Sequence, residues 1–150
     1  MGKRLTVSVL MFFVLGIWMV SCDKQDYETN ISRHSEDESH YTGDNCMNCH
    51  YQAGPGKGLY SIAGSVFGNY QDDDYTVRVF DALTQDTLAL VEIDQLGNLF
   101  TTAPVDFKNG ITVDIINSSG SIVKVMSTVV MNGQCNLCHD GQFEEVIEFF

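Results

Sequence analysis

Basic residues are scarce in this 150-residue chain. Lys and Arg together number 8 against 20 Asp and Glu, which gives a formal net charge of −12 at pH 7. Lys3 and Arg4 lie in a segment that we expect to be removed, so the remaining chain is still more acidic. Such a surface repels nucleic-acid phosphates and anionic lipid headgroups, and it favours partner proteins with basic docking surfaces. We therefore expect no nucleic-acid partner.

Familiar hydrolytic and phosphate-binding motifs are also missing. The Ser residues lack a G-x-S-x-G context, and no Gly-rich phosphate loop is present. Asp72, Asp73 and Asp74 are consecutive carboxylates, but they lack the spaced ligands and the Gly of a calcium loop. We interpret them as a solvated turn, and we find no site typical of a hydrolase.

Long hydrophobic runs are limited to residues 5–20, which follow a basic N-terminus and are too short for a confident transmembrane span. This pattern is typical of a secretory signal peptide over residues 1–21. Met19-Val20-Ser21-Cys22 resembles the lipobox of bacterial lipoproteins, although Leu is commoner at the position of Met19. The resemblance implies lipidation of Cys22 and a lipid anchor in the bacterial cell envelope, outside the cytoplasm, in the periplasm or outer membrane. The alternative is an ordinary signal peptide with a chance Cys.

The other four cysteines form two copies of C-x-x-C-H, the attachment signature of c-type haem. The first copy is Cys46, Cys49 and His50, and the second is Cys135, Cys138 and His139. Two thiols three positions apart can each form a thioether with one vinyl group of a single haem. The His that follows can then bind the iron as proximal ligand. The sequence therefore predicts two haem c groups, each with its iron.

Three other interpretations remain open. The motifs could form C-x-x-C disulfides with incidental His residues. They could form a four-cysteine metal site, although 85 residues separate Cys49 from Cys135, against about 15–20 in a zinc ribbon. They could also support thiol–disulfide exchange, although no βαβ pattern surrounds either motif.

Only two further histidines, His34 and His40, could serve as distal iron ligands. The run His40-x-x-Gly43-x-x-Cys46 resembles one in multihaem cytochromes, where the upstream His is often an axial ligand. Met126 and Met131 precede the second motif and are the alternatives, because thioether ligation is also common and raises the reduction potential. A strand Met is more often core filler, however.

The sequence divides into segments of different composition. Residues 22–45 hold the expected lipidated Cys and a polar stretch that indicates a flexible tether. Residues 46–58 hold the first haem motif and a Gly-rich loop, and residues 59–130 indicate a β-sandwich. Residues 131–150 hold the second haem motif and a C-terminal tail.

Period-two alternation and turn residues predict a mainly β fold. Val77 and Val79 alternate with polar residues, as do Ile111, Val113 and Ile115. We expect an antiparallel β-sandwich of about six strands, flanked by the two C-x-x-C-H segments. The expected strands lie near 59–67, 75–83, 87–93, 97–103, 111–117 and 121–130. No window has a long helical apolar stripe, which argues against a helical cytochrome core.

Three short patterns carry a family resemblance. Ile62-x-Gly64-x-Val66, Val77-x-Val79-x-Asp81 and Asp94-x-x-Gly97-x-x-Phe100 resemble the carboxypeptidase-regulatory-like, transthyretin-like β-sandwich over about 60–120. Such sandwiches are mostly spacers and binding modules, so the resemblance implies a fold and not an activity. The chain without its signal peptide resembles a small bacterial dihaem c-type cytochrome lipoprotein.

We therefore expect an electron carrier rather than a catalyst, with redox proteins as partners and the lipid as membrane attachment. An enzyme would need an open iron position, which the sequence does not reveal. The alternative is a non-redox binding or structural lipoprotein with disulfides or a metal site. Six antiparallel strands return the chain to its starting end, so we also expect the two motifs at one end of the sandwich.

Overall fold

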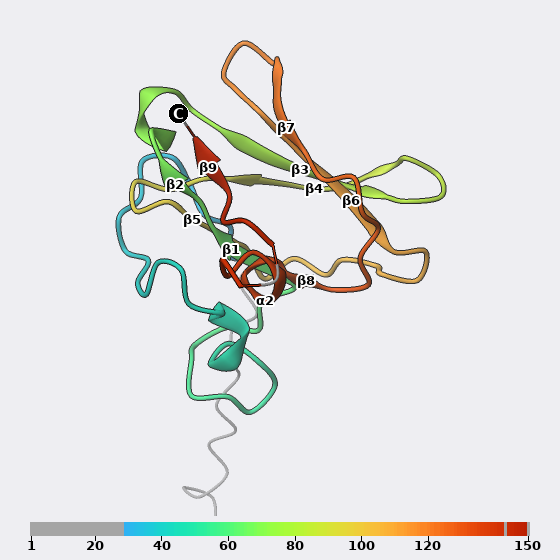
Figure 1. The fold of residues 1–150 in the computed structure, drawn as a ribbon. Coiled ribbons are helices and arrows are strands. Elements are labelled where there is room, and N and C mark those ends of the chain that lie inside the picture. The colour runs from blue at the N-terminus through green and yellow to red at the C-terminus, as the bar shows by residue number, and fades with distance from the viewer. Residues whose placement is uncertain (1–28, 143, 150) are drawn as a thin grey trace, which may run out of the picture.

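The computed structural model describes residues 29–142 and 144–149, and these residues form a mainly β fold with almost no helix (Figure 1). The predicted signal peptide and Cys22 lie outside the described residues. The helices are η1 (Cys46–Asn48), η2 (Tyr70–Asp72) and α2 (Cys135–Cys138). The strands are β1 (Ile62–Ser65), β2 (Phe67–Gly68), β3 (Thr76–Asp81), β4 (Thr87–Glu92), β5 (Asn98–Thr101), β6 (Ile111–Ile116), β7 (Ile122–Val125), β8 (Gly133–Gln134) and β9 (Glu148–Phe149). None of the described helices is long and apolar enough to cross a membrane.

Two larger sheets and one strand pair make up the fold. The first sheet has the order β4-β3-β6-β7 and is wholly antiparallel. The second has the order β5-β1-β8, and β2 pairs with β9. In β3 every second residue is buried, so Val77 and Val79 turn toward the second sheet while Arg78 stays outside. This alternation is the physical basis of the β prediction.

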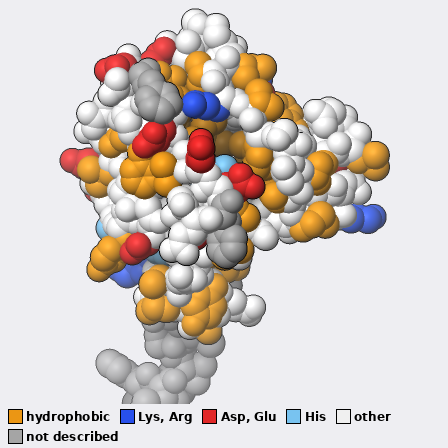
Figure 2. All heavy atoms as spheres, viewed as in Figure 1, with side chains coloured by type: hydrophobic (Ala, Val, Ile, Leu, Met, Phe, Trp, Pro, Cys, Tyr) orange, Lys and Arg blue, Asp and Glu red, His pale blue; other side chains and the backbone are white. Residues whose placement is uncertain are grey.

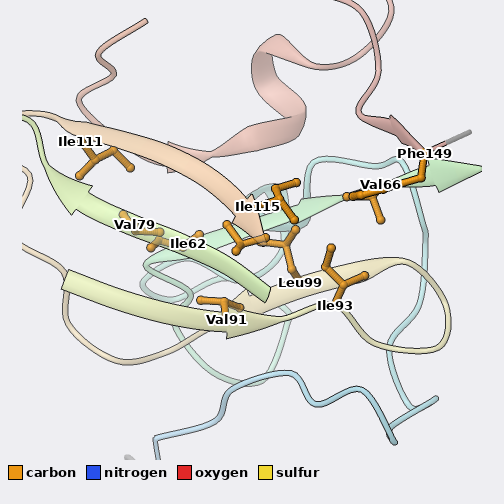
Figure 3. Packing of buried hydrophobic residues seen from close by; sticks show 10 residues of the cluster. Ile62, Val66, Val79, Val91, Ile93, Leu99, Ile111, Ile115 and Phe149 are labelled. Carbon is orange, nitrogen blue, oxygen red and sulfur yellow. The ribbon is translucent and has the colours of Figure 1, made fainter. Parts of the chain in front are cut away.

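The core lies between the two larger sheets. Ile62 and Leu99 come from the second sheet and lie against Val79 and Val91 of the first (Figure 3). Val66, Val79 and Val91 are completely buried. Phe149 closes one side of this core, and its ring centroid lies 4.3 Å from that of Tyr75 with the two rings tilted by 33°.

The prediction of a mainly β fold is confirmed, and each of the six predicted strands is present. The strand count is higher than the predicted six, and the additional strands introduce short parallel pairs. The first predicted strand is divided at Val66 into β1 and β2, and two further strands lie in the segment predicted to be motif and tail. These strands, β8 and β9, pair in parallel with β1 and β2. Each has two residues, which is too short to show an alternation in the sequence.

The prediction of a flexible tether is wrong for residues 30–45, which pack along the sandwich. The amide of Ser32 donates to the Phe100 carbonyl at 3.0 Å, and that of Thr102 donates to Asn30 at 2.9 Å. Ile31 forms an isolated antiparallel bridge with Thr101. This segment covers the free edge of β5, whose backbone groups would otherwise lack partners. Its polarity therefore reflects hydrogen bonding to a sheet edge and not disorder.

Ser32 links the two larger sheets. Its side chain is fully buried, and its Oγ donates to the Glu92 carbonyl of β4 at 2.6 Å. The same Oγ accepts from the Phe100 amide of β5 at 3.0 Å. One hydroxyl therefore satisfies backbone groups from both sheets.

We predict that Ser32→Ala lowers the free energy of unfolding by about 1–3 kcal/mol, because it leaves buried backbone groups without their partner. Ser35→Ala is the matched control, since Ser35 lies in the same segment but is exposed. Its effect should stay within about 0.5 kcal/mol. Urea denaturation of both variants measures the difference. Equal effects would restore the interpretation of this segment as a loose tether.

Candidate functional site

The two C-x-x-C-H motifs lie close together, because both are held against β1. Figure 1 shows α2 of the second motif beside β1. Both η1 and α2 contact β1. The residues directly before each motif also touch, because Asn45 Nδ2 donates to Gln134 Oε1 at 3.1 Å. Segments 89 residues apart in sequence therefore form one site.

Ser65 at the end of β1 connects both motif segments. Its backbone amide donates to Asn136 Oδ1 at 2.8 Å, within the second motif. Its Oγ accepts from the Gly43 amide at 2.9 Å, just before the first motif. The same hydroxyl donates to Asn98 Oδ1 at 2.7 Å. Ser65 is 1% exposed, so these bonds form in a dry environment where they position the partners firmly.

Gly64 allows the second motif to approach β1 closely. A Cβ at this position would lie 2.5 Å from the Cys135 Cβ and 3.0 Å from its Sγ. Only Gly leaves room for a backbone contact this short. The close contact with Cys135 therefore explains the Gly of the pattern Ile62-x-Gly64-x-Val66.

Each motif makes one helical turn that places its His beside the first Cys. The His50 amide donates to the Cys46 carbonyl at 3.0 Å, and that of His139 donates to the Cys135 carbonyl at 2.9 Å. The two motifs thus share this hydrogen bond, although η1 is a 3-10 helix and α2 is an α-helix.

The ring of His50 is held in one orientation. Its Nδ1 lies 2.8 Å from the Lys57 carbonyl, and its ring stacks on Tyr60 at 4.0 Å with an interplanar angle of 4°. A carbonyl can only accept, so Nδ1 carries the proton and Nε2 keeps the lone pair that a metal requires. The Gly-rich loop wraps this ring, since a Cβ at Gly56 would lie 2.8 Å from Nδ1.

The ring of His139 has an equivalent bond. Its Nδ1 lies 2.8 Å from the Glu145 carbonyl, six residues further along the chain. The same argument leaves the lone pair on Nε2. Both motif histidines are therefore prepared by their own following loops to bind a metal through Nε2.

The four thiols are free, and neither described motif forms the disulfide that one alternative requires. Cys49 and Cys138 are exposed, whereas Cys46 and Cys135 are partly buried. Burial raises the pKa of the Cys135 thiol to about 12, and it also raises the pKa of Cys46, with a further contribution from nearby Asp44. Exchange catalysts need a thiol of lowered pKa, so neither Cys46 nor Cys135 suits the role of the attacking thiol.

Within the described residues, no three or more His, Cys, Asp or Glu side chains are grouped to hold a metal ion. A haem iron does not need such a group. The porphyrin nitrogens supply most of its ligands, and the protein adds one or two axial ones.

An apolar cavity of about 250 Å³ opens beside the second motif. Cys138 and His139 form part of its wall, together with Val113, Val125 and Met126. Figure 2 shows hydrophobic side chains around a hollow on the face in view, with a histidine at its edge. The cavity therefore joins the His139 imidazole to a mostly apolar wall.

The two remaining histidines have different positions. The ring of His40 is exposed and lies 5.8 Å from that of His50 between centroids. His34 is held against β4, with Nδ1 at 3.0 Å from the Ile93 carbonyl and Nε2 at 3.9 Å from Glu92 Oε2. The structure thus brings His40, but not His34, to the first motif. Met131 is 61% exposed.

Several site residues were missed by sequence reasoning. Tyr60, Asn45, Gln134 and Ser65 carry no motif, and their roles depend on contacts between distant segments. Only the Gly-rich loop could be recognised from the local sequence, because its composition cannot form a long helix.

No protein-family model, curated protein or solved structure matches the chain. The resemblance of the β strands to the carboxypeptidase-regulatory-like sandwich therefore stays a prediction. The function must be argued from the geometry of the site itself.

We predict that Asn136→Ala lowers the free energy of unfolding by about 1–3 kcal/mol, because Asn136 is buried and accepts from the Ser65 amide. Leu137→Ala is the matched control in the same motif. Leu137 is 48% exposed, so its loss should cost only about 0.5 kcal/mol. Denaturant unfolding of both variants measures the two changes in the free energy of unfolding. A larger effect at the apolar Leu137 would contradict this account of how the motif is held.

Proposed function

We propose that this chain is an envelope electron-transfer protein that carries two covalently attached c-type haems. The observation that carries the proposal is the shared geometry of the two motifs. In each, a C-x-x-C turn ends at a His whose Nδ1 donates to a backbone carbonyl and whose Nε2 is left for iron.

The residues present fit this cofactor. Cys46 and Cys49 would hold the first haem and Cys135 and Cys138 the second, all through thioethers, with the motif histidines as proximal ligands. When bound, each haem supplies an iron that alternates between the ferric and ferrous states. The chain supplies the orientation of the axial imidazoles. At the second motif it also supplies an apolar wall, which is the environment that a porphyrin face requires.

Electron transfer suits the first site better than catalysis. His40 lies beside His50, where a second imidazole would close the iron to substrates. Asp44 is exposed and lies close enough to Cys46 to raise its pKa, so the rim of this site is acidic. An acidic rim attracts a basic redox partner and speeds its docking.

The proposed lipid at Cys22 would keep the domain close to a membrane. The chain is bound to the sandwich from Asn30 onward, through its hydrogen bonds with Thr102. Eight residue steps join Cys22 to Asn30. They span at most about 28 Å, so the haem pair would exchange electrons near the membrane surface.

The full chain, expressed with a haem-attachment system, should have an intact mass equal to its processed polypeptide plus two haems. It should also show a Soret band. A variant with both Cys135→Ala and Cys138→Ala should carry one haem, because the first motif has its own ligands and its own loop. A native mass without haem would support the non-redox lipoprotein instead.

A further inference from the structure

The second motif lacks a distal histidine. The chain has four His, of which two are in the motifs, one lies beside His50 and one is held by Glu92 on β4. If the proposed haems are present, a protein ligand at the sixth position of the second iron has to be a side chain other than His. The walls of the cavity beside His139 limit the choice.

Register places Met126 on the inner face of its sheet. In the β6–β7 pair, Asp114 lies opposite Val125 and Ile115 opposite Lys124. The ladder continues with the Met126 amide donating to the Val113 carbonyl at 2.9 Å. Residues that lie opposite each other share a face, and Val113 packs against the core. The Met126 side chain therefore lies on the same face of the sheet as Val113, and it is half-buried there.

The cavity brings Met126 and the second motif together. Both Met126 and His139 lie on its wall, along with Cys138. Lys124 lies there too, but an ammonium group has no lone pair to offer to iron. The thioether of Met126 is neutral and tolerates an apolar wall, and its flexible side chain can adapt to a bound porphyrin.

We infer that Met126 is the sixth ligand of the second haem, whereas His40 serves the first. This inference rests on the proposed function. The two sites are then unequal, because His/Met ligation raises the reduction potential relative to ligation by two histidines. The second haem is the more oxidising of the pair, and electrons pass from the first motif to the second.

The test uses the full chain after intact mass has established two attached haems, so failure of attachment is recognised separately. The oxidised protein should show the near-infrared sulfur-to-iron charge-transfer band of a His/Met haem. Met126→Leu should abolish this band and lower the higher of the two midpoint potentials in a redox titration. Leu keeps the volume of Met, so the variant should fold.

Met131→Leu is the matched control, because Met131 is exposed and lies five residues further along. It should keep the band and both potentials. A two-haem protein without the band, or one that keeps it in Met126→Leu, would overturn the inference. If Met126→Leu cannot be purified, Met131→Leu and Met47→Leu test the same assignment by elimination. The band must persist in both, and its loss in either would contradict the role of Met126.

Discussion

The short parallel pairing of β8 with β1 determines where the second C-x-x-C-H motif lies. Gly133 lies opposite Ile62, and Gln134 lies opposite Ala63. The two backbones are so close that a Cβ at Gly133 would lie 2.1 Å from the Ser61 carbonyl oxygen, so this position requires Gly. The chain then turns directly into α2 beside Gly64.

The first motif is held by the same strand. The Gly43 amide donates to Ser65 Oγ at the end of β1. His50 stacks on Tyr60, which lies just before β1 in the sequence. A four-residue strand thus positions both motifs, and the core on its inner face keeps it rigid. The β domain would act as a clamp for two cofactors, with a spacing that loops alone would not fix.

Much of the fold could be predicted from the sequence, and so could the closeness of the two motifs. The alternation of Val77 and Val79 indicates a sheet with one buried face. The spacing of C-x-x-C-H predicts haem attachment, which stays a proposal. The two motifs lie close together, as their expected placement at one end of the sandwich required, but the strand count does not explain this closeness. The second motif is placed by the parallel pairing of β8 with β1, and not by an even number of antiparallel strands. A strand of two residues is too short to be predicted from the sequence.

Contacts between distant segments account for what the sequence did not show. Ser32 and its neighbours look like a polar tether because hydroxyl and amide groups that bind a sheet edge have the same composition as a solvated linker. Asn136 looks like a variable position within the motif, although it is buried and the neighbouring apolar Leu137 is exposed. Such roles depend on the partner that tertiary structure provides.

The central claim is that the sandwich holds two haems side by side, and electron paramagnetic resonance of the oxidised protein tests it directly. The reference spectra come from two one-haem variants. One variant lacks Cys135 and Cys138, and the other lacks Cys46 and Cys49. The account predicts magnetic coupling between the two ferric irons, so the native spectrum should differ from the sum of the two one-haem spectra. A native spectrum equal to that sum, in a protein with both haems attached, would contradict the account.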